Sequence, residues 1–88
     1  AAEARRNQDA ASRRAEQDRI GVAVDANRQR LEADRARTER QRTAAANPAE
    51  SERMRLDFEQ RRQAAERERE ELERQRAASE ARPAPPEP

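Results

Sequence analysis

Large apolar side chains are almost absent from this sequence. Leu, Ile, Val and Phe together account for seven of its 88 residues, and a single Met completes the set. Burying so few side chains cannot offset the conformational entropy that is lost when a chain of this length becomes ordered. An ordinary globular domain with a hydrophobic core of its own is therefore excluded.

The residues that replace them favour helices. Ala and Arg, with twenty of each, are strong helix formers, and together with Glu and Leu they give the chain the composition of a long helix or coiled coil. We therefore expect an all-α, coiled-coil-like fold without a compact private core.

Proline divides the chain into segments. Pro48 stands alone in the middle, and the other four prolines lie within the last six residues. We predict a first helix over 1–46, a second over 47–82 that begins at Pro48 and ends near Ala81, and an extended, mobile tail over 83–88. Gly21 is a soft point in the first helix, because Gly costs about 1 kcal/mol relative to Ala inside a helix.

The junction between the helices has a strong start signal. In Asn47-Pro48-Ala49-Glu50, Asn suits the N-cap, Pro suits the first helical position, and Glu50 can reach back to the cap. Proline also keeps Asn47 out of the α region. A break between two helices is the leading prediction, and a sharp kink within one rod is the alternative.

The second helix carries a thin apolar seam. Phe58, Ala65 and Leu72 recur every seven residues at heptad position a, and Met54 lies four residues before Phe58 at position d. The remaining d positions are polar, so a partner must leave them in contact with water or supply matching charges. They are Arg61, Glu68 and Gln75.

The first helix has a matching seam. Ile20 takes position d, Val24 and Leu31 take position a, and Asn27 at the intervening d is suited to fixing the register. We predict that the apolar residues of both seams contact partner helices, and that the isolated chain is helical but loosely associated until a partner fixes it.

Charged residues flank the seam of the second helix. In a parallel pair of chains, position g of one chain meets the following position e of the other. The predicted pairs are Glu50 with Arg55, Asp57 with Arg62, and Glu71 with Arg76.

A hairpin is disfavoured by the same flanks. Folding the first helix back would set its row of arginines (Arg14, Arg28, Arg35 and Arg42) against the row on the second helix. Net charge favours the hairpin, because residues 1–46 sum to +3 and the rest to −2. We give the contact-distance pairing more weight than the screened net charge.

The missing residue types exclude several chemistries. Without His or Cys there is no Cys/His metal site, thiol redox couple or imidazole base, so we expect no enzyme, cofactor or metal. Glu66, Glu70 and Glu73 share a helical face, which we interpret as a solvated charged surface. No motif carries a resemblance to a known family.

The predicted function is a non-enzymatic structural or assembly subunit: a strut, spacer or clamp that binds protein partners in a homo- or hetero-oligomeric coiled coil. One alternative is an Arg-rich helical nucleic-acid-binding protein, which nineteen interleaved carboxylates disfavour. Another is a solitary charged helix or disordered linker.

The compartment stays open. No stretch approaches the ~20 apolar residues that a transmembrane helix needs, so we expect a soluble chain. The chain begins without Met, as a processed mature protein or a piece of a longer one would, and periplasmic and organellar locations are compatible with it.

Overall fold

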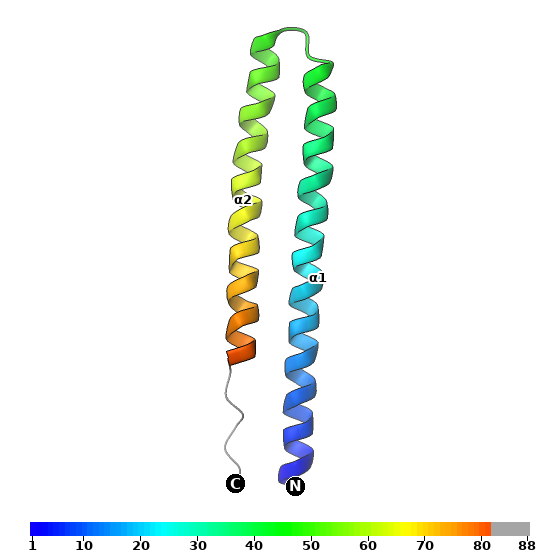
Figure 1. Ribbon diagram of the computed structural model, residues 1–88, viewed down its shortest axis with the longest axis vertical. Coiled ribbons are helices and arrows are strands. Elements are labelled where there is room, and N and C mark those ends of the chain that lie inside the picture. The colour runs from blue at the N-terminus through cyan, green and yellow to red at the C-terminus, as the bar shows by residue number, and fades with distance from the viewer. Residues whose placement is uncertain (82–88) are drawn as a thin grey trace.

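The chain folds into two long helices that lie side by side. The computed structural model describes residues 1–81, in which helix α1 spans Ala2–Thr43 and helix α2 spans Pro48–Ala81. The helices run antiparallel and are joined by the short connection at residues 44–47 (Figure 1). The predicted all-α, helix-break-helix fold is confirmed. The tail expected over 83–88 lies outside the described residues.

The molecule is a rod. Its extents are 69 × 15 × 9 Å and its radius of gyration is 20.4 Å, whereas a compact domain of this length has a radius of gyration of about 12 Å. Among residues 1–81 the buried apolar side chains are Ile20, Val24 and Phe58, and none of them is completely shielded from solvent. The chain therefore has no compact core, as its composition predicts.

Helix α1 is continuous through Gly21. The position that a Cβ would take there has no neighbouring atom within 4 Å, so no close approach of α2 requires a glycine. The soft point therefore neither interrupts the helix nor marks a tight helix–helix crossing.

Helix α1 ends before the residue that the sequence indicates. Its last residue is Thr43 rather than Ala46, and the Thr43 hydroxyl donates a hydrogen bond of 2.9 Å to the Glu39 carbonyl. The amide of Ala44 still donates to the Arg40 carbonyl, at 3.1 Å. Local hydrogen bonding of this kind satisfies carbonyls that a helix end leaves unpaired, and it frees residues 44–47 to reverse the chain.

The start of α2 follows the predicted capping pattern. The side-chain oxygen of Asn47 accepts a hydrogen bond from the Glu50 amide at 2.9 Å, and its carbonyl accepts one from the Ser51 amide at 3.2 Å. The Glu50 carboxylate reaches back to the amide of Ala46 at 3.1 Å, one residue before the cap. The tight cap fixes the direction in which α2 leaves the turn.

Replacing the cap should loosen the turn. We expect Asn47→Ala to lower the free energy of unfolding by about 1 kcal/mol, because the Glu50 amide loses its side-chain acceptor. Urea unfolding followed by circular dichroism measures the change. Asn47→Asp, which keeps an acceptor, is the matched control, and an Asn47→Ala variant as stable as the control would show that the cap contributes nothing.

Candidate functional site

The apolar residues of the two predicted seams meet inside the chain. Ile20, Val24 and Phe58 are each less than a tenth exposed. Ile20 and Leu72 line one hollow between the helices. These side chains therefore hold the hairpin together.

The remaining seam residues are only half-buried. Leu31 and Ala65 line a second hollow from opposite helices, and Met54 is also half-buried. The hollow at Leu31 measures about 200 Å³ and the one at Leu72 about 250 Å³. The seam is therefore incompletely filled. Whether its residues also contact a partner stays a prediction.

Asn27 fixes the register between the helices. Its side chain is buried, and its amide nitrogen donates a hydrogen bond of 2.9 Å to the carbonyl of Ala65 on α2. A buried amide that loses its partner is destabilising, so sliding one helix along the other is penalised. A second contact near the open end has the same effect, because Ser79 donates to the Glu16 carboxylate at 3.3 Å.

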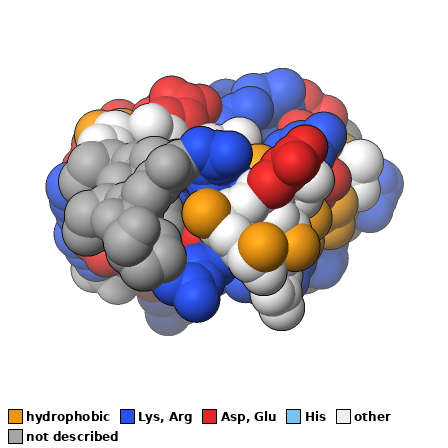
Figure 2. All heavy atoms as spheres, turned by 90° about the horizontal axis from the view of Figure 1, so that it is seen from below, with side chains coloured by type: hydrophobic (Ala, Val, Ile, Leu, Met, Phe, Trp, Pro, Cys, Tyr) orange, Lys and Arg blue, Asp and Glu red, His pale blue; other side chains and the backbone are white. Residues whose placement is uncertain are grey.

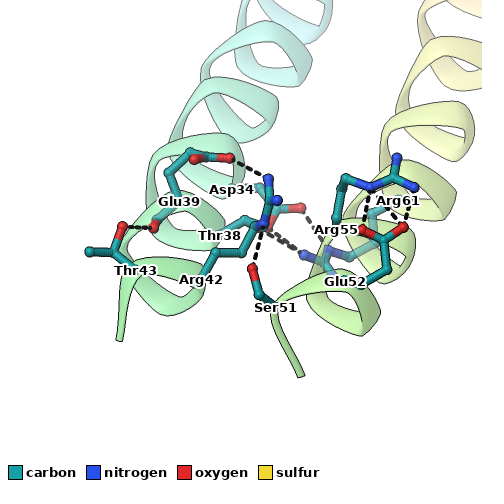
Figure 3. Close-up of polar contacts among 9 residues, drawn as sticks. All are labelled: Asp34, Thr38, Glu39, Arg42, Thr43, Ser51, Glu52, Arg55 and Arg61. Atoms are coloured by element: carbon teal, nitrogen blue, oxygen red, sulfur yellow. Dashed lines mark hydrogen bonds and ion pairs between the residues drawn. The ribbon is translucent and has the colours of Figure 1, made fainter. Parts of the chain in front are cut away.

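Helix α1 supplies the charges that the polar d positions of α2 require. Glu68 forms an ion pair of 2.7 Å with Arg30. Arg61 donates to both carboxylate oxygens of Asp34, at 2.8 and 3.0 Å, and to the Thr38 hydroxyl at 3.2 Å (Figure 3). A bidentate Arg–carboxylate pair is directional as well as attractive, so it sets the register of the helices near the turn.

Asp34 is better shielded from solvent than Glu68: its side chain is 13% exposed, whereas that of Glu68 is 50% exposed. The hydrogen bond from Arg61 holds the pKa of Asp34 below its ordinary value, against the opposing effect of burial, and Arg37 adds to the lowering. The ionised form is therefore favoured in the folded hairpin.

Phe58 is held between two guanidinium groups. The Cζ atoms of Arg35 and Arg61 lie 5.4 and 5.9 Å from the centre of its ring. Both distances fall within the range of cation–π contacts. The one aromatic side chain of the protein is thus shielded by arginines from both helices, which substitute for the apolar neighbours that the sequence lacks.

One side of the hairpin carries a regular pattern of charges, which we call the ladder face. From Asp18 to Arg42 on α1 and from Glu52 to Glu80 on α2, heptad position b is acidic and position e is Arg except at Gly21, so opposite charges alternate at spacings of three and four residues along one side. The ladder face consists of Asp18, Asp25, Arg28, Glu32, Arg35, Glu39 and Arg42 on α1, and of Glu52, Arg55, Glu59, Arg62, Glu66, Arg69, Glu73, Arg76 and Glu80 on α2.

Neighbouring charges of the ladder face are ion-paired along α2, and on α1 Arg42 lies 3.2 Å from Glu39. Arg62 contacts Glu59 at 3.0 Å and Glu66 at 3.2 Å. Arg55 donates to Glu52 at 3.0 Å. These hydrogen bonds lower the pKa of Glu52 and Glu59 and raise that of Arg55 and Arg62. The charges of these arginines are therefore neutralised by carboxylates on their own helix.

This local neutralisation explains why the hairpin forms although the facing rows of arginines disfavour it. Arg35 of α1 does line the same hollow as Arg62 and Arg69 of α2, so the rows face each other. Arg62 contacts the carboxylates of Glu59 and Glu66. The Nε atom of Arg69 lies 4.0 Å from the Glu73 carboxylate, without a hydrogen bond to it. The prediction that the two facing rows of arginines disfavour the hairpin was therefore wrong, because it treated them as uncompensated positive charge.

The residues predicted to set register and charge have other partners in the single chain. Asn27 bridges the helices, and the Glu50 carboxylate accepts a hydrogen bond from the Ala46 amide. Glu71 accepts from Arg74 at 2.8 Å, and Arg76 lies 3.8 Å from Glu80. The pairs between chains predicted for these residues, and for Arg55, Asp57 and Arg62, stay predictions.

Sequence reasoning missed the shielded polar residues at the ends of the seam. Thr38 and Ser79 are both buried. They fall at position a in the same frame as Leu31 and Leu72, which was the available signal. Among residues 1–81, no group of three or more acids gathers as a metal site would require, and neither helix has a stretch apolar enough to span a bilayer.

Truncating the aromatic ring should weaken the hairpin. We expect Phe58→Ala to lower the free energy of unfolding by about 3 kcal/mol, because a buried ring is lost together with its contacts to both helices. Leu56→Ala, at a half-exposed site on the same helix, is the control and should change stability little. Equal effects of the two substitutions in thermal unfolding would place Phe58 outside the seam.

The Asp34–Arg61 pair should give stability a defined pH dependence. Because the pKa of Asp34 is lowered on folding, its contribution is complete above the ordinary value of 3.8 and is lost as the pH falls through the folded value. We expect Asp34→Asn to lower the free energy of unfolding by about 1 kcal/mol at pH 7. The variant should also lose less stability as the pH falls, which makes the acid limb of the stability–pH curve shallower. Glu68→Gln, in a more exposed pair, is the control. An unchanged acid limb in Asp34→Asn would contradict this assignment.

The hairpin is thus a thin seam, crossed by polar contacts and bordered on one side by the ladder face. What it does must be inferred from these features. No family model, no curated protein and no solved structure matches the chain.

Proposed function

We propose that this chain is a non-enzymatic structural subunit, a strut or spacer that binds partner helices in a larger assembly. The observation that carries the proposal is the rod shape, 69 Å long, without a compact core. A shape of this kind sets a distance between other molecules and encloses no volume in which a reaction could be shielded from water.

The hairpin is suited to holding a fixed length. Two helices joined side by side resist bending better than one, and Asn27 and Arg61 tie them together at separate levels. Intrahelical ion pairs support the exposed surface without tertiary packing. Acidic and basic side chains are interspersed at the end of the rod seen in Figure 2, as expected for a subunit that must not aggregate through its surface.

The same features leave room for partner helices. The hollows at Leu31 and Leu72 are open to solvent, and both side chains are only half-buried. A partner helix that covers them would bury apolar area without displacing α1 from α2. Partner contact through these residues is thus compatible with the closed hairpin.

The charge balance argues against nucleic acid on the ladder face. It carries nine carboxylates and seven arginines, so a chain of phosphates would be repelled overall. The contacts between helices likewise argue against a solitary helix or a disordered linker, because Asn27 and Arg61 have partners on the other helix.

Photo-cross-linking in native material tests the proposal. We would place a benzophenone amino acid at Ala4 or at Ala46, exposed positions near opposite ends of the rod. We expect each position to yield adducts with defined polypeptides other than this chain, because a strut is contacted at both ends. The same group at the exposed, mid-rod Gln29 is the control. Adducts with nucleic acid alone, or no intermolecular adducts from either end, would contradict the proposal.

A further inference from the structure

We propose that the ladder face binds a second copy of this chain, in a dimer whose two-fold axis runs along the rod. The inference rests on the proposed structural function and names one partner for it.

The inference rests on which residues of α1 and α2 lie at the same height along the rod, which we call the same level. Asp34 contacts Arg61, and Glu16 contacts Ser79. Counting equal numbers of residues along α1 and α2 from these contacts sets Arg28 level with Glu66 to within one residue, a shift of about 1.5 Å. The levels of the other charged residues of the ladder face follow from the heptad repeat, since each seven-residue step along α1 matches a seven-residue step along α2.

Charges that lie at the same level on the ladder face are therefore opposite, and the pattern is interrupted at Gly21, which is level with Glu73. The arginines of α1 are level with glutamates of α2, as in Arg28 with Glu66. The acids of α1 are level with arginines of α2, as in Asp25 with Arg69. This alternation continues from Asp18, level with Arg76, to Arg42, level with Glu52. A surface with such a pattern is complementary to its own copy once α1 is placed over α2.

A two-fold axis along the rod achieves that placement. It sets α1 of one copy over α2 of the other and leaves every residue at its own level, so Arg28 faces Glu66 of the second copy and the reverse contact forms as well. No sliding along the rod is compatible with this symmetry. About a perpendicular axis the copies can slide, and a slide of half a heptad, about 5 Å, opposes like charges.

The arginines of the ladder face retain N–H donors that can bind a second copy. Arg55 donates to Glu52 through Nε and Nη2, whereas a guanidinium has five N–H donors. The side chains of Arg55 and Arg76 are about half exposed. The second copy would also cover the hollow lined by Leu31 and Ala65, which opens between Arg35 and Arg62 on this face. Both apolar side chains would lose contact with water.

The dimer should be weak and sensitive to salt. Exposed ion pairs are individually worth little, and salt screens them. We expect sedimentation equilibrium at ~0.5 mM chain to give about twice the monomer mass of 10.1 kDa in 20 mM NaCl and the monomer mass in 500 mM NaCl. A monomer at both salt concentrations, or a dimer that salt does not dissociate, would overturn the proposal.

Charge reversal with mixing tests the pairing itself. In Arg28→Glu alone, both symmetric contacts of the dimer oppose two carboxylates, and in Glu66→Arg alone both oppose two arginines. Each variant should be monomeric in 20 mM NaCl, and an equimolar mixture should recover the dimer mass, because both contacts of the mixed dimer are again attractive. A mixture that stays monomeric, or single variants that dimerise as well as the parent chain, would overturn the pairing.

Two controls keep this result interpretable. Arg67→Glu and Glu70→Arg change the net charge equally at exposed positions outside the ladder face, and each should dimerise like the parent chain. Loss of dimer in these controls would also count against the proposal. Circular dichroism verifies that each variant is helical, and Asp25→Arg mixed with Arg69→Glu repeats the test at another rung if either first variant unfolds.

The outcome is separable from that of the proposed function. A monomeric chain whose ends still cross-link to other polypeptides would contradict the proposed dimer and support the proposed strut. A salt-sensitive dimer whose ends cross-link to no polypeptide other than this chain would support the dimer and contradict the strut.

Discussion

The contact between Arg61 and Asp34 shows the constraint on which the rest of the structure depends: two long helices must stay together with almost nothing apolar between them. Three buried apolar side chains cannot define a register alone. Directional polar contacts take over that task, from Asn27 in the middle to Arg61 near the turn. A polar seam is less stabilising than an apolar one, but it penalises every wrong alignment because a misplaced buried polar group loses its partner.

Local charge pairing is the second condition for the hairpin. Arginines at position e of both helices face each other, and on α2 neighbouring carboxylates, such as Glu59 and Glu66 beside Arg62, offset that charge at contact distance. The same alternation keeps each helix stable while its outer surface is fully hydrated. One pattern of charges thus supports the single helix, permits the hairpin and gives the ladder face its complementarity to a second copy.

The sequence determines much of this architecture and leaves part of it open. The Asn47-Pro48 junction, the scarcity of apolar residues and the seam positions of Ile20, Val24 and Phe58 are local or periodic signals, and the structure has them as predicted. The spacing of Arg62 from Glu66 and of Arg69 from Glu73 can be read from the sequence, and the hairpin is disfavoured only when the rows of arginines are considered without these carboxylates. The roles of Asp34 and Thr38 depend on the level at which α2 returns, which no local pattern contains.

The central claim is that this chain closes into a registered hairpin without a core. A distance between spin labels at Ala15→Cys and Ala77→Cys tests it most directly, since the chain has no Cys of its own and both sites are exposed. For the isolated chain we predict one narrow distribution below about 40 Å, as side-by-side helices require, in place of the loose association that the sequence alone predicts. A peak near 90 Å, as in a continuous helix, or a broad distribution without a maximum would contradict the account.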